Sequence, residues 1–226
     1  MPRKIDRLYK YSSKKWRDLF LSEGSIRIGT LHDYRKKEHS PGIHDAHEGL
    51  KTISHHIDEW DFSKSDHATA YHEAASRALG LIQIDPGGTS GSISGMSFIK
   101  EFNDPDCFVH CTAHSLSKTV MHEFQGADSC FEIYDIAGFY KQLTNSINEI
   151  VPVEFGGIRV IRYTSRDETF NGSDLGISPT WIKGREFSKQ LEVRAIWHPK
   201  GEKQIAPLEF NDMRLARYGQ KVKARK

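Results

Sequence analysis

A short segment near residue 190 concentrates the side chains with the most useful chemistry. The sequence from Gln190 to Trp197 alternates between polar and apolar residues, which predicts a β-strand. One face carries Gln190, Glu192 and Arg194. In a cleft, a carboxylate can stabilise positive charge on a sugar carbon as a glycosidic bond breaks, and an arginine can bind phosphate through two nitrogens. An ordinary ion pair between Glu192 and Arg194 is the alternative. The opposite face carries the apolar residues that a core needs, Leu191, Val193, Ala195 and Trp197.

Two other segments offer groups that could share a site with Glu192. Residues 25–30 alternate as a strand and place Arg27 opposite the apolar face, beside a glycine where a ligand could approach closely. Thr164 and Ser165 end another expected strand. Together with Glu192, these groups support a binding or catalytic site. The ordinary ion pair between Glu192 and Arg194 stays the alternative.

Histidines crowd the segment from residue 32 to residue 72, and the tightest group is His44-Asp45-Ala46-His47-Glu48. Its nitrogen and carboxylate groups are of the kind that bind a divalent metal. The two histidines lack the spacing of a metalloprotease helix, in which histidines four residues apart accompany a glutamate. We therefore favour a polar loop without a metal and keep a metal-dependent nuclease as an alternative.

Two cysteines and two histidines also lie close together in the segment from Cys107 to His114. On a strand, Cys107 and Cys111 point to one side and His110 to the other, so the ligands of a zinc site would not converge. Buried strand cysteines are the better explanation. A cysteine nucleophile needs a nearby base, and Cys111 beside His110 or His114 remains open as an alternative.

The composition describes a globular chain with nearly balanced charge. The 226 residues include 37% hydrophobic residues, and the formal net charge is +2, so the overall field would not attract nucleic acid or an anionic membrane. The exception is the basic stretch from Arg214 to Lys226, which could contact nucleic-acid phosphates. We expect one domain over residues 1–213 and a basic tail over residues 214–226.

The number of cysteines and the lack of long apolar stretches indicate the cellular compartment in which the protein is expected. The sequence holds 3 cysteines, an odd number, and no stretch suited to a signal peptide or a membrane span. We expect a cytoplasmic protein that does not enter a membrane.

Short helices and strands of irregular spacing are expected along the chain. Helices are expected between residues 13 and 24, over residues 64–79 and 115–124, and between residues 135 and 152. Residues 85–92 are expected to form a flexible loop. The mixture favours a single-domain α+β fold with a mixed, largely antiparallel sheet. Strands are expected over residues 25–30, 50–60, 81–84, 107–112, 129–134, 157–165, 190–197 and 204–209.

The order of several short motifs resembles a broad group of uncharacterised bacterial and phage proteins. These motifs are Leu8-Tyr9-Lys10-Tyr11-Ser12-Ser13, the segment from Gly24 to Arg35, Asp45 with Glu48-Gly49, Cys107-Phe108, Met121, Gly126, Cys130, and Gln190-Leu191-Glu192-Val193-Arg194. The opening motif and the late strand are in turn similar, more remotely, to the ADP-ribosyltransferase fold. That resemblance implies an ADP-ribosyltransferase-like α+β fold and NAD as a substrate.

The resemblance also implies a role for each residue of the candidate site. Glu192 would be the catalytic carboxylate, and Gln190 would position the acceptor. Arg27 and Lys10 would contact NAD, and Thr164-Ser165 would form a structural hydroxyl motif. The resembling group often carries histidine where this chain has Lys10, whose ammonium is a point charge without planar donor geometry.

The leading hypothesis is an ADP-ribosyltransferase-like enzyme that cleaves the nicotinamide glycosidic bond of NAD, as a toxin or phage-defence effector. A regulatory protein partner would keep such an enzyme silent. The first alternative is a non-enzymatic module that binds nucleic acid or a protein through its polar cleft and basic tail. The second is the metal-dependent nuclease built on the histidine-rich segment.

Overall fold

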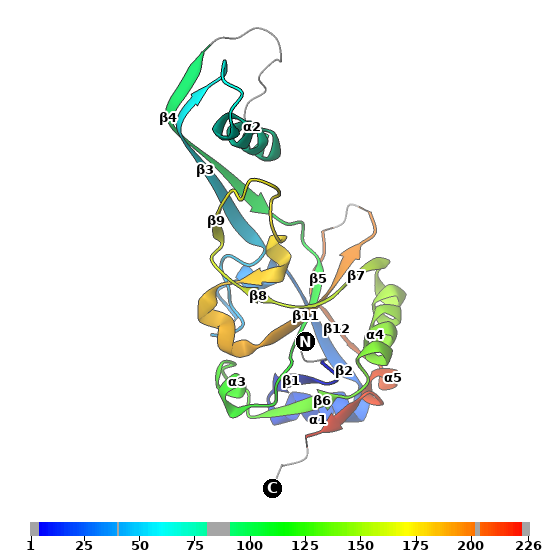
Figure 1. Ribbon diagram of the computed structural model, residues 1–226. Coiled ribbons are helices and arrows are strands. Elements are labelled where there is room, and N and C mark those ends of the chain that lie inside the picture. The colour runs from blue at the N-terminus through cyan, green and yellow to red at the C-terminus, as the bar shows by residue number, and fades with distance from the viewer. Residues whose placement is uncertain (1–4, 40, 81–90, 202–203, 223–226) are drawn as a thin grey trace. The chain divides into compact units, whose positions relative to one another are not determined.

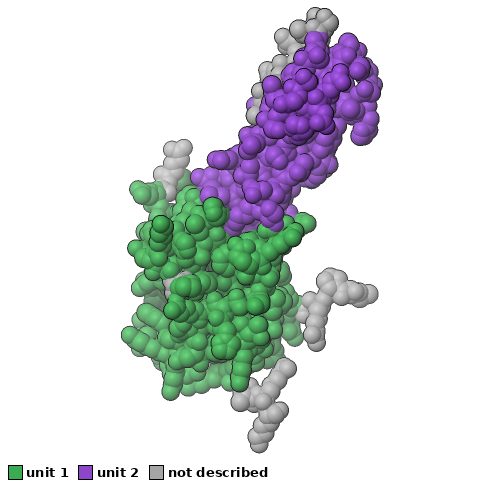
Figure 2. Space-filling model, turned by 90° about the vertical axis from the view of Figure 1, so that its left-hand side faces the viewer, with its two compact units in different colours: residues 1–48, 105–164, 183–226 green, residues 49–104, 165–182 purple. Residues whose placement is uncertain are grey.

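The computed structural model describes residues 5–39, 41–80, 91–201 and 204–222. The chain divides into two compact units, shown in different colours in Figure 2. Unit 1 contains residues 1–48, 105–164 and 183–226, and unit 2 contains residues 49–104 and 165–182. Helices and largely antiparallel strands occur in the described chain, so the expected α+β class is confirmed.

An eight-stranded sheet is the framework of unit 1 (Figure 1). Strand β11 pairs with both β5 and β7 and so joins β7 to the sheet. The order of the other strands is β12 (Leu208–Asn211), β2 (Ser25–Thr30), β5 (Phe108–Ala113), β1 (Leu8–Ser12), β6 (Ser129–Ile133) and β13 (Gly219–Lys221), while β11 spans Glu192–Pro199 and β7 spans Val153–Val160.

The sheet forks at β5. One edge of β5 pairs with β11 along the whole length of β5. The other edge is shared, because β2 pairs with Phe108 and Val109 while β1 pairs with Ala113. In these registers, residues 110–112 of β5 lie opposite neither β1 nor β2. The two branches of the sheet therefore separate beside His110, Cys111 and Thr112.

Two helices cover one face of this sheet. Helix α1 (Lys14–Glu23) begins at the Ser13 cap and ends at Gly24, whose φ of 67° is the left-handed conformation that glycine adopts readily. Helix α4 (Ile136–Ile150) begins where the Asp135 side chain accepts a hydrogen bond from the Gly138 amide. The core between them and the sheet contains an extensive apolar cluster, which includes Leu8, Phe20, Ile28, Phe108, Phe139, Leu143, Val193, Ala195 and Trp197.

Three expectations for the end of unit 1 need correction. The strand expected from Gln190 starts at Glu192, because Leu191 has a φ of 49° and Gln190 ends the 3-10 helix η3 (Arg185–Gln190). The strand expected over residues 204–209 lies over Leu208–Asn211 instead. The stretch from Arg214, expected as a tail, contains part of α5 (Met213–Ala216) and all of β13, which pairs with β6.

Several shorter strands and helices were expected with other bounds or were not expected. The strand expected over residues 157–165 is wrong in its bounds, because β7 begins at Val153 and ends at Val160, and the short β8 covers Arg162–Tyr163. Thr164 and Ser165, expected at the strand end, lie outside both strands, and β8 pairs with β10 (Ile182–Lys183). Helix α3 (Lys118–His122) is shorter than the helix expected over residues 115–124, and the 3-10 helix η1 covers Asp33–Arg35.

Unit 2 is built on a long antiparallel pair of strands, β3 (Leu50–Asp61) and β4 (Ser92–Asn103), with β9 (Asp167–Thr169) parallel to β3. Helix α2 (His67–Leu79) confirms the helix expected near residues 64–79, and η2 covers Pro179–Trp181. No strand was expected at β4. The strand expected over residues 81–84 and residues 85–90 of the expected loop lie outside the described residues.

In the part of the chain that the structure describes, no helix combines the length and the apolar character needed to cross a membrane.

Candidate functional site

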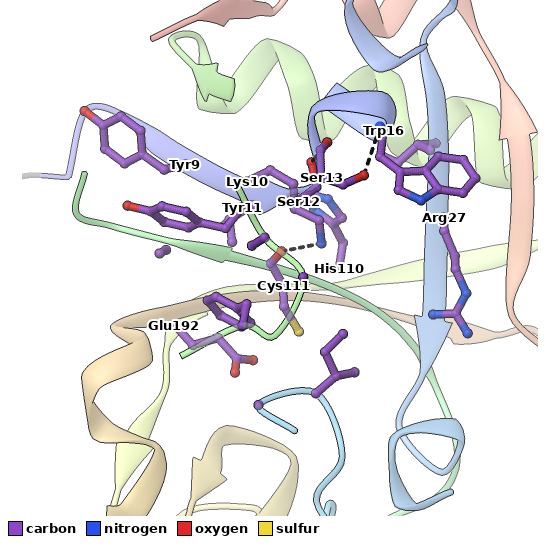
Figure 3. A pocket seen from close by; sticks show the side chains of 18 of the residues that line it. Tyr9, Lys10, Tyr11, Ser12, Ser13, Trp16, Arg27, His110, Cys111 and Glu192 are labelled. Atoms are coloured by element: carbon purple, nitrogen blue, oxygen red, sulfur yellow. Dashed lines mark hydrogen bonds between the residues drawn. The ribbon is translucent and has the colours of Figure 1, made fainter. Parts of the chain in front are cut away.

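A cavity of about 480 Å³ lies at the fork of the unit 1 sheet (Figure 3). Its walls come from β1, β2, β5, β11 and the start of α1, so both branches of the sheet and the strand that joins them contribute. This volume falls within the usual range for small-molecule sites, roughly 300–1,000 Å³. The lining includes the aromatic residues Tyr9, Tyr11, Trp16, Tyr34 and Phe124.

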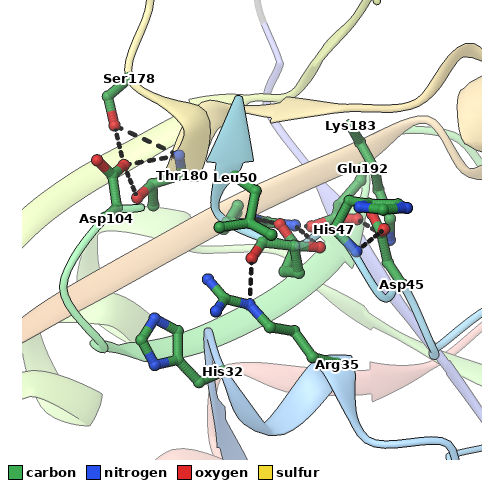
Figure 4. Close-up of polar contacts among 12 residues, drawn as sticks. His32, Arg35, Asp45, His47, Leu50, Asp104, Ser178, Thr180, Lys183 and Glu192 are labelled. Atoms are coloured by element: carbon green, nitrogen blue, oxygen red, sulfur yellow. Dashed lines mark hydrogen bonds and ion pairs between the residues drawn. The ribbon is translucent and has the colours of Figure 1, made fainter. Parts of the chain in front are cut away.

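Glu192 lies in this cavity as part of a buried network of charges. The guanidinium of Arg194 binds Glu48 through two nitrogens, at 2.8 Å (Nη1–Oε1) and 3.2 Å (Nη2–Oε2). The Nε of the same arginine lies 2.9 Å from Oε1 of Glu192. Lys183 Nζ lies 3.1 Å from the other Glu192 oxygen, Oε2, and both residues are labelled in Figure 4. Two carboxylates and two cations therefore balance one another in the interior.

The neighbours of the network fix the position of Lys183 and of the Glu192 backbone. The side-chain oxygen of Gln190 accepts a hydrogen bond from Lys183 Nζ at 3.0 Å, and the Gln190 amide donates to the carbonyl of Gly42 at 2.7 Å. The backbone amide of Glu192 donates to the hydroxyl of Tyr163 at 2.7 Å. The carboxylate thus occupies a position that several elements of unit 1 determine.

The network keeps Glu192 ionised. Burial by itself would raise the pKa of the Glu192 carboxyl, but Arg194 and Lys183, together with hydrogen bonds from Cys111 and Arg194, lower this pKa far below its ordinary value. Burial would lower the pKa of Lys183, yet Glu192 and Glu48 raise it overall. Glu192 is therefore a permanently ionised carboxylate in the cavity lining, within a network whose two carboxylates and two cations balance in charge.

Two further cations line the cavity, Lys10 from β1 and Arg27 from β2. The Lys10 ammonium donates to the carbonyl of Cys111 at 2.8 Å, and burial lowers the pKa of this amine. The Arg27 guanidinium lies 2.7 Å from Oδ2 of Asp33 and 3.4 Å from Oε1 of Glu209, and its side chain remains 39% exposed. An anionic ligand in the cavity would therefore meet one partly exposed guanidinium and one enclosed amine.

The structure brings together some of the residues that the sequence nominated and separates others. Glu192, Arg27 and Lys10 line the same cavity, whereas Gln190 is fully buried and contacts the lining residues Lys183 and Gly42. The Thr164-Ser165 pair is absent from the cavity lining. The Thr164 amide donates to the Lys183 carbonyl, and the exposed Ser165 hydroxyl accepts from the Asp167 amide.

Sequence reasoning missed Lys183 and gave Glu48 no partner. Lys183 follows the apolar pair Trp181-Ile182, which is a weak sign that this lysine enters the interior with them. Glu48 belongs to the histidine-rich group of the sequence, and its long separation from Arg194 along the chain hides their pairing. Burial of Glu192 and Arg194 requires only that their charges be paired, which the two residues can do with each other, so no signal in the sequence pointed to Glu48 or Lys183 as further partners.

The histidine-rich segment does not gather metal ligands. Glu48 is held by Arg194, and Oδ1 of Asp45 accepts a hydrogen bond from the His47 amide (Figure 4). Among the described residues, no group of three or more His, Cys, Asp or Glu side chains is placed to hold a metal ion. The observed contacts therefore give no support to the nuclease alternative.

Cys111 lies on the same side of β5 as Glu192, and His110 faces the other way toward Tyr140, as the strand alternation predicts. Burial, with a further contribution from Glu192, raises the pKa of the Cys111 thiol to about 12. A thiol that remains protonated at neutral pH is a poor nucleophile. This environment argues against the cysteine-nucleophile alternative.

No protein-family model matches this sequence, and neither a curated protein nor a solved structure shows significant similarity to it.

Proposed function

We propose that unit 1 is an ADP-ribosyltransferase-like enzyme that binds NAD and cleaves its nicotinamide glycosidic bond. One observation carries the proposal: an ionised, buried carboxylate, Glu192, lines the same cavity as two cations, Lys10 and Arg27. NAD has complementary chemistry. Its pyrophosphate is anionic, and its ribose develops positive charge when the bond to nicotinamide breaks.

Glu192 would supply electrostatic stabilisation to the reaction. As the bond between the ribose C1′ carbon and the ring nitrogen breaks, its electron pair moves to nicotinamide and leaves positive charge on the sugar. A carboxylate that is already ionised and fixed in place stabilises that charge without reorganisation. A nucleophile, either water or an acceptor group, then forms the new bond to C1′ and loses its proton.

Arg27 is the better placed of the two cations to bind the pyrophosphate, because its guanidinium is partly exposed and has the planar geometry that matches phosphate oxygens. Lys10 adds a second positive charge to the cavity lining. Aromatic side chains along the walls, among them Tyr9, Tyr34 and Trp16, provide surfaces for the flat rings of a dinucleotide.

In this proposal Gln190 positions Lys183, and through it the Glu192 carboxylate, rather than an acceptor. The side chain of Gln190 is fully buried and makes hydrogen bonds to Lys183 and Gly42. The Thr164-Ser165 pair has no ligand contact in the proposal. An enzyme with this activity would deplete NAD, which fits a toxin or phage-defence effector restrained by a partner protein.

The nucleic-acid alternative gains little from the described part of the basic segment. Arg214 binds Glu149 at 2.9 Å and Asp212 at 2.8 Å, so its charge is largely neutralised within the protein. The Lys221 ammonium lies 3.7 Å from Asp18. The cavity is therefore the better supported site.

Calorimetric titration with NAD tests the binding half of the proposal. Arg27→Ala should weaken NAD binding at least tenfold, while Asp33 keeps its contacts with Lys36 and His39 and the unit remains folded. Arg162→Ala is the matched control, because Arg162 is exposed on β8 and does not line the cavity. Equal NAD affinity in the wild type and Arg27→Ala would contradict the assigned pyrophosphate site.

A further inference from the structure

His110 has a polar atom that the protein itself leaves unsatisfied. Its side chain is 1% exposed, and Nδ1 lies 3.2 Å from the hydroxyl of Tyr140 on α4. The other ring nitrogen, Nε2, is buried and has no hydrogen-bond partner among the described residues. An unsatisfied buried polar group destabilises the folded state, so such atoms commonly have a partner in the functional state.

This histidine lines the cavity at the fork. It occupies the part of β5 where neither β1 nor β2 pairs, and the cavity contacts it there (Figure 3). Phe20, Ile26 and Phe131 also line the cavity, and they belong to the apolar cluster on the α1 and α4 side of the sheet. Glu192 and Cys111 lie on the opposite side of β5 and β11. The cavity is therefore lined by side chains from both faces of the sheet.

The imidazole is uncharged. Burial, reinforced by the nearby charge of Lys10, lowers the pKa of His110 well below its ordinary value. A neutral imidazole can donate through one nitrogen and accept through the other, and the hydrogen bond to Tyr140 fixes the plane of the ring. The cavity lining thus combines apolar side chains with one uncharged imidazole, whose Nε2 has no partner among the described residues.

We propose that Nε2 of His110 hydrogen-bonds the carboxamide of the nicotinamide ring and so selects NAD over ligands without that ring. This inference rests on the proposed function. A flat aromatic ring suits the apolar walls, and a carboxamide carries both a donor and an acceptor, so it satisfies Nε2 in either tautomer of the histidine. The phosphates of the same ligand would lie nearer the exposed guanidinium of Arg27.

The test compares the affinities of NAD, ADP-ribose and free nicotinamide for three proteins. His110→Leu removes the nitrogen and should weaken NAD and nicotinamide binding at least tenfold, while ADP-ribose affinity stays within about twofold. His110→Gln places an amide near the position of Nε2 and should recover a substantial part of the loss. Tyr140→Phe is the matched control, because it removes the bond to Nδ1 and keeps Nε2.

Each result has a distinct meaning. An equal loss of NAD and ADP-ribose affinity in His110→Leu, no loss at all, or a loss as large in Tyr140→Phe would overturn the role of Nε2 and leave the NAD proposal standing. A wild-type protein that binds neither NAD nor nicotinamide would overturn the proposed function and this inference together.

A measurement on the wild type keeps the proposal testable if the His110 variants do not fold. Nicotinamide should shift the ¹⁵N resonance of His110 Nε2 and leave that of Nδ1 nearly unchanged, since Nδ1 already binds Tyr140. Saturating nicotinamide that binds without moving the Nε2 resonance would overturn the proposal.

Discussion

Lys183 Nζ lies 3.1 Å from Oε2 of Glu192, and both side chains are almost completely buried. The two residues come from different elements, since Lys183 ends β10 and Glu192 begins β11. Arg194 occupies the other oxygen of the same carboxylate at 2.9 Å. Both oxygens therefore have a cationic partner, and Glu192 acts as a fixed negative charge and not as a group that exchanges protons near neutral pH.

The first prediction concerns pH. The pKa of Glu192 is lower in the folded protein than in the unfolded chain, so the stability that this carboxylate contributes is present above the unfolded value, about 4.3, and is lost as the pH falls toward the folded value. The rate of NAD cleavage should show no loss from Glu192 protonation between about pH 5 and about pH 8. A pH–rate profile checks this.

The control for the pH profile is the stability of the protein under the same conditions. Urea unfolding at each pH separates a loss of folded protein from a loss of catalysis. Two observations together would contradict a fixed charge at Glu192. The folded protein would lose activity with an apparent pKa near 6, and the carboxylate resonance of Glu192 would titrate over the same pH range.

The second prediction concerns the buried ion pair between Arg194 and Glu48. Arg194→Met removes one cation and leaves Glu48 buried without its partner, so the free energy of unfolding should fall by about 3–5 kcal/mol. Adding Glu48→Gln restores charge balance, because the pair of Lys183 and Glu192 remains, and should recover part of the loss. Urea unfolding of both variants measures the effect, and a single variant as stable as the wild type would refute it.

The third prediction concerns thiol reactivity. The pKa of Cys111 is raised to about 12 and that of Cys130 to about 11, chiefly by burial, and Cys107 is also buried. All three thiols should react with iodoacetamide at least tenfold more slowly at about pH 8 in the native protein than in urea. Mass spectrometry of the labelled peptides measures this, and fast native labelling of Cys111 would reopen the nucleophile alternative.

The fourth prediction concerns Gly24, which ends α1 with a φ of +67°. A Cβ atom there would lie 1.8 Å from the backbone oxygen of Asp212, so Gly24→Ala requires a backbone shift in addition to the left-handed conformation. Gly201→Ala is the matched control, with a φ of +83° and no atom within 4 Å of the added Cβ. The control should lose about 1–2 kcal/mol of stability and Gly24→Ala clearly more; equal losses would contradict the close approach.

Local patterns predicted much of unit 1. The serine and aspartate caps of α1 and α4 and the alternation in β2 and β5 act within a few residues, so they can be read from the sequence. The face of β11 that carries Val193, Ala195 and Trp197 does pack into the core, as expected. Charge, spacing and a family resemblance identified three candidate site residues, Glu192, Arg27 and Lys10. These three residues line one cavity.

Long-range relations could not be predicted in this way. The fork at β5 depends on where β1 and β2 pair along the same edge, which no local pattern specifies. The left-handed turn at Leu191 interrupts an alternation that the sequence continues, and so removes Gln190 from the strand. The pairing of Arg194 with Glu48, and of Lys183 with Glu192, arises from tertiary packing of the interior.

The role of the Glu192 carboxylate in catalysis can be measured as the release of nicotinamide from NAD by the wild type and by the double variant Lys183→Met/Glu192→Gln. This double variant removes one cation and one anion, so Arg194 and Glu48 remain as a balanced pair. Lys183→Met alone is the control, because it keeps the Glu192 carboxylate. We expect nicotinamide release by the wild type, measurable release by the control, and a rate lower by roughly 100-fold or more in the folded double variant. A double variant that releases nicotinamide as fast as the control, or a wild type that releases none, would contradict this role of Glu192.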